Sequence, residues 1–294
     1  MTVVRILPDH PLSKSTTIGT GGPAAAFAQP ESLAELEEAL GWASERELDV
    51  VAVGLGSNLL AADSGVDALV VRLAGDLATV EVDGELLRAG GGATNAVCLH
   101  RSRSAGLGGL EFACAIPGTA GGGVRMNAGA YGSDWAAILQ RALVVSADGS
   151  GWLTADELGL SYRHSELGPG QVVARVEYRL SPRPVDEIKA DVADLVARRK
   201  ATQPTNKRTC GSVFKNPPGE LGAGRMLEQC GLKGHRIGGA VISPRHANFV
   251  ENAGGATSAD CLALIAEARR RAREQYGVDL QHEVVLWGLA LPGA

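Results

Sequence analysis

Aromatic residues and long apolar runs are both scarce in this chain. Phe, Trp and Tyr make up only 4% of the 294 residues, so we expect the main chain, more than stacked rings, to contact a ligand. The apolar runs are much shorter than a bilayer span, and the N-terminus lacks a basic stretch followed by an apolar one. These absences predict a soluble, cytoplasmic protein with no membrane partner.

Paired cysteines are also missing. Five cysteines are scattered without a Cys-x-x-Cys pair or a partnered histidine, namely Cys98, Cys114, Cys210, Cys230 and Cys261. This pattern argues against a zinc site and against an extracellular disulfide framework. We therefore predict no metal site and free thiols.

A net positive charge is absent as well. The formal net charge of -5 argues against general nucleic-acid binding. The segment from Lys207 to Arg245, however, contains seven Lys or Arg residues and only two acidic residues, Glu220 and Glu228, which gives a local net charge of +5. This stretch suggests an anionic ligand, although a solvated surface would explain it equally well.

Glycine, in contrast, is abundant, with 39 residues. Six of them fall within residues 116–132, a segment that contains no Asp, Glu or Lys. Glycine is accepted where the main chain takes a positive φ or lies directly against a ligand. A flexible linker would add Ser and charge and would lack the apolar residues found here. The segment predicts a folded shelf for a flat or phosphorylated molecule; the alternative is a set of tight turns in a glycine-rich sheet.

A second glycine-rich loop follows a strand predicted at 50–53. It reads Gly54-Leu55-Gly56-Ser57-Asn58-Leu59-Leu60, which resembles part of a dinucleotide fingerprint. That fingerprint requires a helix directly afterwards, whose N-terminus binds the pyrophosphate. Residues 61–65 instead predict a turn, and 68–73 another strand. A Rossmann site is therefore disfavoured, but successive N–H groups in the loop could still bind phosphate.

The remaining patterns predict a mixed α and β chain. Helices are predicted at 33–48, capped by Ser32 with Glu35, and at 93–105, 185–200, 223–230 and 259–276, the last between Thr257 or Ser258 and Gly277. Further strands are predicted at 80–82 and 86–89 around an Asp83-Gly84 hairpin, and at 142–146, 172–180, 211–218, 240–243 and 283–287. Residues 181–184 read as a boundary. We infer an α+β fold with two regions, 14–182, built from two α/β subdomains, and 195–294.

Seven motifs in this order resemble those of the UDP-N-acetylenolpyruvoylglucosamine reductase family. They are Gly54 to Leu60, Ile116-Pro117-Gly118-Thr119, Met126-Asn127-Ala128-Gly129-Ala130-Tyr131-Gly132, Tyr162-Arg163-His164-Ser165, Gly211-Ser212-Val213-Phe214-Lys215-Asn216-Pro217, Gly231-Leu232-Lys233-Gly234 and His246-Ala247-Asn248-Phe249. The resemblance implies an FAD-binding region of the vanillyl-alcohol-oxidase type at 14–182 and a UDP-sugar-binding domain at 195–294. It also implies non-covalent FAD, NADPH as reductant, and reduction of UDP-N-acetylglucosamine enolpyruvate to UDP-N-acetylmuramate in bacterial cell-wall peptidoglycan synthesis.

The resemblance assigns roles to single residues. It implies that Arg163 contacts the substrate carboxylate, that Glu283 helps to polarise an enolate, and that Ser212 donates a proton. Guanidinium suits the first role because it is always charged and offers a planar fork of donors. The implied FAD contacts are Gly54, Ser57, Asn58, Ile116, Gly122 and Gly129, and the implied substrate contacts are Asn216, Lys233 and His246.

Departures from the family pattern and two alternatives remain. Ala115 stands where the family usually has Gly, and the interval between Arg163 and Ser212 is too short for the extra loop that carries a substrate-covering tyrosine. The chain thus resembles the shorter form of the family. The alternatives are another flavin oxidase or dehydrogenase of the same fold and a non-catalytic UDP-sugar binder. The sequence does not determine the oligomeric state.

Overall fold

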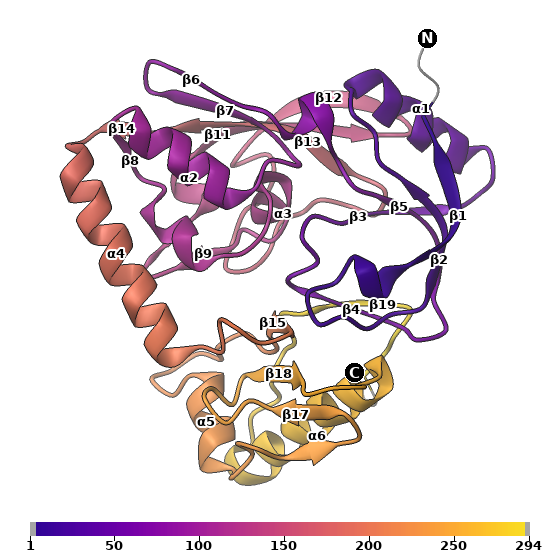
Figure 1. Cartoon of the computed structure of the whole chain (residues 1–294), viewed down its shortest axis with the longest axis vertical. Coiled ribbons are helices and arrows are strands. Elements are labelled where there is room, and N and C mark those ends of the chain that lie inside the picture. Colours follow the sequence, from indigo (N-terminus) through magenta and orange to yellow (C-terminus); the bar gives the residue numbers. More distant parts are fainter. Residues whose placement is uncertain (1–3, 292–294) are drawn as a thin grey trace. The chain divides into compact units, whose positions relative to one another are not determined.

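The computed structural model describes residues 4–291, which form two compact units. The first unit comprises residues up to Pro8, Ala26–Leu55 and Asp67–Arg199, and the second comprises Asp9–Ala25, Gly56–Val66 and the residues from Lys200 onward. The chain therefore passes between the units several times. Figure 1 labels the helices and strands along its course. The predicted domain limits, 14–182 and 195–294, remain a prediction, and residues 292–294 lie outside the described part.

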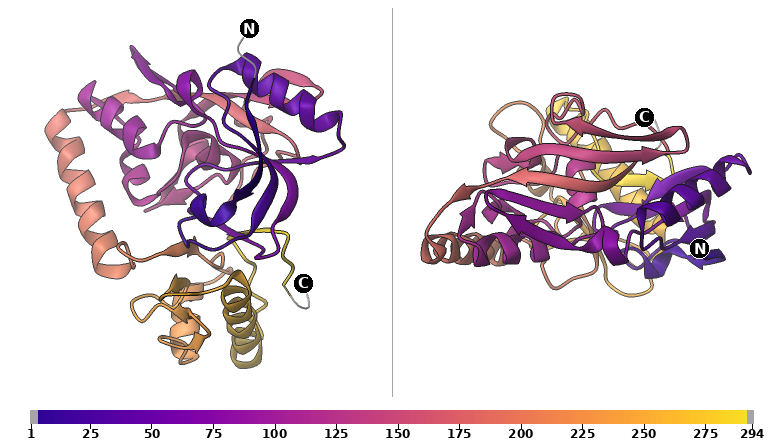
Figure 2. Two further views of the ribbon diagram at one scale, coloured as in Figure 1. Left: turned by 45° about the vertical axis from the view of Figure 1, so that its right-hand side comes forward. Right: turned by 90° about the horizontal axis from the view of Figure 1, so that it is seen from above.

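The first unit is built on a five-stranded sheet with the order β12-β11-β13-β7-β6, whose strands lie side by side in Figure 2. Every neighbouring pair in it is antiparallel. The predicted Asp83-Gly84 hairpin is confirmed, with Gly84 at a φ of 58° between β6 and β7. The strands are β6 (Val80–Asp83), β7 (Leu86–Gly90), β11 (Leu139–Ser146), β12 (Gly149–Thr154) and β13 (Val172–Arg179).

Both faces of this sheet carry apolar side chains, because successive residues of a strand point to opposite sides. In β13, Val173 and Val176 belong to one buried cluster, whereas Val172 and Ala174 belong to another. The first cluster packs against α2 (Asn95–Ser104) and α3 (Ala120–Arg125), and the second against α1 (Leu33–Ser44). A sheet with helices on its faces is thereby closed from water.

The remaining elements of the first unit complete this frame. A four-stranded sheet has the order β1-β2-β5-β3, and the chain changes unit within β1 and within β2. The predicted boundary segment at 181–184 contains β14, which pairs with β8. The elements are β1 (Ile6–Pro11), β2 (Pro23–Ala28), β3 (Asp49–Ala52), β5 (Val66–Val71), β8 (Leu107–Gly108), β9 (Gly129–Ala130), β10 (Ser133–Asp134), β14 (Ser181–Pro182) and α4 (Val185–Thr202).

The second unit has its own sheet, β15-β18-β17-β16, packed against α6. Its core includes Ile18 and Leu60 from the early chain, both fully buried among residues of the last third. Leu60 lies in β4, which pairs in parallel with β19. The elements are β4 (Leu59–Ala61), β15 (Thr209–Ser212), α5 (Ala223–Gln229), β16 (Arg236–Ile237), β17 (Ala240–Ile242), β18 (Phe249–Asn252), α6 (Ser258–Tyr276) and β19 (Val285–Trp287).

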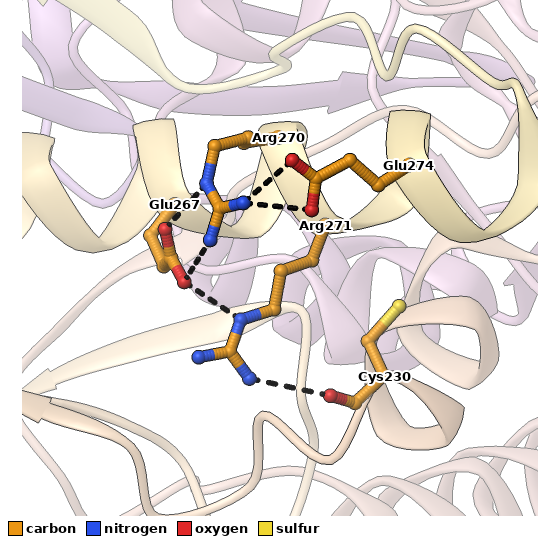
Figure 3. Close-up of polar contacts among 5 residues, drawn as sticks. All are labelled: Cys230, Glu267, Arg270, Arg271 and Glu274. Carbon is orange, nitrogen blue, oxygen red and sulfur yellow. Dashed lines mark hydrogen bonds and ion pairs between the residues drawn. The ribbon is translucent and has the colours of Figure 1, made fainter.

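An ion-pair network covers one side of α6 (Figure 3). Glu267 accepts hydrogen bonds from Arg270 and Arg271, and Arg270 also binds Glu274. Arg271 reaches further, and its Nη1 donates to the carbonyl oxygen of Cys230 at 3.5 Å, just past the end of α5. The two arginines hold the pKa of Glu267 down at about 2. The network thus joins α6 to the end of α5.

Most predicted helices are observed close to their expected limits. Thr257 caps α6 in a full capping box with Asp260, and Gly277 ends it in the left-handed conformation. The first helix, α1, ends at Ser44 rather than near Leu48, and α3 was not predicted. Within the part of the chain that the structure describes, none of the helices has both the length and the apolar character needed to cross a membrane.

Candidate active site

In the first unit, the glycine shelf at 116–132 contains the short helix α3 and the strand β9. Two of its glycines face inward, where a Cβ added to Gly121 would lie 2.8 Å from the carbonyl oxygen of Val173, and one added to Gly123 would lie 2.6 Å from the ring of Trp135. Gly122 faces outward, since a Cβ there would meet only the Thr119 Oγ1, at 3.4 Å. The inner glycines let α3 approach the core closely, and the exposed Gly122 leaves bare backbone at the surface.

The two glycine-rich loops meet in this unit. A Cβ added to Gly54 would lie 2.6 Å from Oγ1 of Thr119, the residue that caps α3. Behind the shelf, the buried Asn95 donates from its backbone N–H to the Gly118 carbonyl and from its Nδ2 to the Ile116 carbonyl, both at 3.0 Å. Asn95 therefore fixes the main chain on either side of Pro117.

These loops fit a flavin dinucleotide. Among residues 4–291, the hydrogen bonds of the structure use neither the N–H of Gly54 nor that of Gly118. Backbone N–H groups that are not used within the protein can donate to the oxygens of phosphates. The surface at Gly122 also lacks a side chain that would fill the space of a flat ligand. Both features match what FAD would require of these residues.

Arg163 lies against the shelf within the same unit. It occupies a tight turn closed by reciprocal hydrogen bonds between Ser161 and His164, with a φ of 53° that is unusual for a residue other than glycine. Its Nη2 donates to the carbonyl oxygen of Gly129 at 2.5 Å. The structure thus brings together a predicted catalytic residue and a predicted cofactor residue.

Asn127 holds this turn in place, a role that the sequence analysis missed. Its Nδ2 donates to the Ser161 carbonyl at 2.8 Å, and its Oδ1 accepts from the N–H of Ala136 at 2.9 Å. The side chain is almost fully buried. Asn127 belongs to the motif that ends at Gly132, but motif matching alone gives no reason for its amide.

The second unit brings Ser212 and Glu283 into neighbouring segments. Ser212 ends β15, and the next residue, Val213, accepts a hydrogen bond from the Glu283 N–H at 2.7 Å. The carbonyl oxygen of Glu283 in turn accepts from Nδ2 of Asn58 at 3.1 Å. Gly211 allows the closest approach, because a Cβ there would lie 2.7 Å from the Ser57 carbonyl oxygen. Two predicted catalytic residues and two predicted cofactor residues therefore gather in this unit.

The three predicted substrate residues surround α5 in the second unit. Asn216 accepts a hydrogen bond from the N–H of Ala223, the first residue of α5, at 3.0 Å. Lys233 forms an ion pair with Glu228, with Nζ 2.5 Å from Oε1. His246 packs on Gly224, where an added Cβ would lie 2.5 Å from its ring. A short helix thus collects all three side chains.

The surroundings of the His246 ring favour its neutral form. Burial of the ring lowers its pKa below the ordinary value, and the charge of Lys233 lowers it further. The Nδ1 atom accepts a hydrogen bond from the N–H of Asn248 at 3.2 Å. In a neutral ring the other nitrogen then carries the proton. His246 can therefore offer a donor, Nε2–H, to a ligand.

Comparison with known proteins agrees with these features. Residues 24–152 match the model of an FAD binding domain, and residues 203–287 match that of the UDP-N-acetylenolpyruvoylglucosamine reductase C-terminal domain. A solvent-stable cholesterol oxidase shares the fold of the first region, with a TM-score of 0.50, 18% identity, and coverage of 61% of this chain and 38% of that one. The fold and the family model define an FAD-binding protein.

Relatives along the whole chain are more specific. UDP-N-acetylenolpyruvoylglucosamine reductase 2 of Symbiobacterium thermophilum is 44% identical over 97% of this chain and 92% of its own length. The reductase of Anaeromyxobacter dehalogenans strain 2CP-C is 45% identical over 96% of this chain and 85% of its own length. The crystal structure of the Thermus caldophilus enzyme covers 98% of this chain and 100% of its own, with 37% identity and a TM-score of 0.84. The chain belongs to the UDP-N-acetylenolpyruvoylglucosamine reductase family.

The comparisons confirm several predictions. The fold is α+β, with an FAD-binding region of the vanillyl-alcohol-oxidase type followed by the C-terminal domain of the reductases. FAD is the cofactor, and the protein is a flavoenzyme. The Rossmann interpretation of Gly54 to Leu60 is excluded, because the loop leads into β4 and not into a helix. The roles of the individual site residues stay predictions.

Proposed function

We propose that this chain reduces the enolpyruvyl group of UDP-N-acetylglucosamine enolpyruvate to UDP-N-acetylmuramate, with NADPH as the reductant, in the cytoplasm and for peptidoglycan synthesis. The observation that supports this most directly is the gathering of Ser212, Glu283, Ser57 and Asn58 in the second unit of a chain from this family. We also propose that residues 14–182 bind FAD and that 195–294 bind the UDP-sugar.

The chemistry requires two kinds of group from the protein. FAD, when bound, supplies the transfer of a hydride from a nicotinamide to an alkene. The alkene is conjugated with a carboxylate. When the terminal carbon of the alkene gains the hydride, negative charge therefore builds on that carboxylate. The protein must stabilise this charge and deliver a proton to the adjacent carbon.

Ser212 supplies the proton in this proposal. A hydroxyl is a weak acid, but an enolate is a strong base, and a neutral donor suits a site closed to water. Glu283 lies on the segment paired with Val213, and it contributes to polarising the enolate. Arg163 binds the carboxylate in this proposal, because a guanidinium keeps its charge and presents a planar fork of donors that matches a carboxylate.

The residues around α5 hold the nucleotide in this proposal. Lys233 offers an ammonium group, and His246 offers the Nε2–H described above. Asn216 still has its amide nitrogen as a donor, since its Oδ1 is the atom used by α5. A diphosphate would explain why the stretch from Lys207 to Arg245 is basic.

Ser212→Ala tests the role of the hydroxyl by separating the two half-reactions. Flavin reduction by NADPH should remain intact, while reoxidation by the enolpyruvyl-UDP-sugar should slow by about 10²- to 10⁴-fold, the usual contribution of acid catalysis. Stopped-flow absorbance of the flavin measures both rates. Ser150→Ala, at an exposed position of β12, serves as the control. Equal slowing of both half-reactions would refute a proton donor at Ser212.

The visible spectrum of the purified protein tests the wider proposal. A flavoenzyme shows the absorption bands of oxidised flavin, which bleach with NADPH and return with the enolpyruvyl-UDP-sugar. Return of the bands with an alcohol substrate in place of the UDP-sugar would favour another flavin oxidase of this fold. Binding of UDP without any flavin bands, even after FAD is added, would favour a non-catalytic UDP-sugar binder.

A further inference from the structure

Glu228 binds the ammonium group of Lys233, the same group that the proposed function assigns to the nucleotide. Glu228 lies in the last turn of α5, and Lys233 lies in the turn that follows. Within residues 4–291, Glu228 is the hydrogen-bond partner that the structure gives to the Lys233 ammonium. The side chains of Lys233 and Glu228 are 31% and 54% exposed. A ligand in solution can therefore reach both members of the pair.

The ion pair itself carries no net charge. The Lys233 ammonium contributes one positive charge and the Glu228 carboxylate one negative charge, and Arg225 also acts on this carboxylate as a positive charge. The hydrogen bond from Lys233 lowers the pKa of Glu228, so the carboxylate stays ionised at neutral pH. An anion that approaches Lys233 thus meets a cation already neutralised, with a carboxylate in direct contact with it.

The local backbone holds this arrangement without help from a ligand. Gly231, at a φ of 70°, ends α5 and turns the chain, and the N–H of Leu232 donates to the Leu227 carbonyl at 3.2 Å. The N–H of Gly234 then donates to the Ile242 carbonyl at 2.9 Å. These bonds fix the main chain on both sides of Lys233, so that its side chain can change partner while the backbone stays in place.

We propose that Glu228 is an internal competitor for Lys233, which an anionic group of the nucleotide must displace in order to bind. The inference rests on the proposed function, because it takes Lys233 as a nucleotide contact. Substrate and product share the UDP group, so one carboxylate weakens the binding of both. When the product leaves, Glu228 pairs again with the ammonium, which would otherwise stay unpaired beside His246. Glu228 therefore weakens the binding of the nucleotide and favours the dissociation of the product.

Glu228→Gln tests the competition, because glutamine keeps the shape of the side chain but loses its charge. The probe is UDP, titrated into the FAD-loaded protein by calorimetry. We expect the dissociation constant to fall by about two- to fivefold, the range of a partly exposed ion pair. In a Lys233→Gln background UDP should bind more weakly, and the gain from Glu228→Gln should shrink because there is no ammonium left to release.

The matched control is Glu274→Gln. This substitution removes the same charge from the same unit, and it also breaks an exposed ion pair, the one between Glu274 and Arg270 (Figure 3). The Glu274→Gln variant should therefore bind UDP with the dissociation constant of the wild type. An unchanged or raised dissociation constant in Glu228→Gln would overturn the proposal and make Glu228 a support for Lys233. An equal gain in the Lys233→Gln background would overturn it in favour of general charge repulsion.

The two proposals fail in different ways. If the proposed function is wrong, the wild type will not oxidise NADPH in the presence of the enolpyruvyl-UDP-sugar. If only the inference is wrong, the wild type will turn this substrate over normally, and the UDP titration of Glu228→Gln alone will disagree. A wild type that binds no UDP would overturn both.

Discussion

Replacing Gly211 tests whether its close approach to Ser57 in the second unit is needed for stability and turnover. It has a φ of 80°, and a Cβ there would lie 2.7 Å from the carbonyl oxygen of Ser57. Gly211→Ala therefore combines two costs, a left-handed backbone with a side chain and a clash with main-chain atoms. The second cost cannot be relieved by rotating a side chain, because the contacting atom belongs to the backbone.

Gly277 provides a control that carries only the first cost. Its φ is 68°, and a Cβ there would meet nothing within 4 Å. An alanine in the left-handed region costs about 1–2 kcal/mol, and forcing one extra carbon into a packed site adds about 1–3 kcal/mol. Gly277→Ala should thus lose about 1–2 kcal/mol and Gly211→Ala about 2–5 kcal/mol.

Thermal unfolding and turnover measure the two consequences. One kcal/mol corresponds to a shift of about 2–4 °C in the melting temperature of a domain of 150–250 residues, so Gly211→Ala should melt clearly below Gly277→Ala. Turnover should also fall only in Gly211→Ala, because relieving the clash moves the neighbouring Ser212. Equal losses of melting temperature in the two variants, with unaltered turnover, would show that the close approach to Ser57 is not needed.

Two further predictions concern arginines. Arg163→Lys should reduce turnover severely, because a lysine cannot hold the Gly129 carbonyl while presenting a planar fork to a carboxylate; near-normal steady-state kinetics would rule out the fork. Arg270 and Arg271, which bind Glu267 in Figure 3, lower the pKa of its carboxyl group to about 2. The stabilising contribution of Glu267 is therefore present above the unfolded pKa of about 4.3 and is lost as the pH falls towards 2. The melting temperature of Glu267→Gln should therefore be lower than that of the wild type at neutral pH, and it should fall less between pH 4.5 and 2. An equal fall in melting temperature for the variant and the wild type across that range would contradict this.

The sequence predicted the regular helices well because their signals are local. Thr257 and Gly277 bracket α6 by capping chemistry that involves only neighbouring residues. The helix α3 was missed for the opposite reason. Ala-Gly-Gly-Gly has a poor helix propensity, and the helix forms because its glycines let it pack against Trp135 and Val173. Such contacts lie outside any local pattern.

Motif matching proposes Ser212, Arg163 and Glu283, whose roles stay predictions. It gives no role to Asn127, which holds the turn at Arg163. Asn127 and Asn95 act through side-chain hydrogen bonds to backbone groups, and amide side chains with such a role have no characteristic spacing in the sequence. The pairing of Lys233 with Glu228 depends on the turn at Gly231. Only the three-dimensional structure brings these partners together.

The second unit combines segments from the beginning and the end of the chain, and this affects when it can fold during synthesis. Ile18 and Leu60 are made early, yet they are buried by residues of the last third of the chain, and β4 has no β19 to pair with until Val285–Trp287 has been translated. At about 5–20 residues per second, that interval is on the order of tens of seconds. During it, the apolar segment Leu59–Ala61 lacks the strand beside which it is buried in the finished protein.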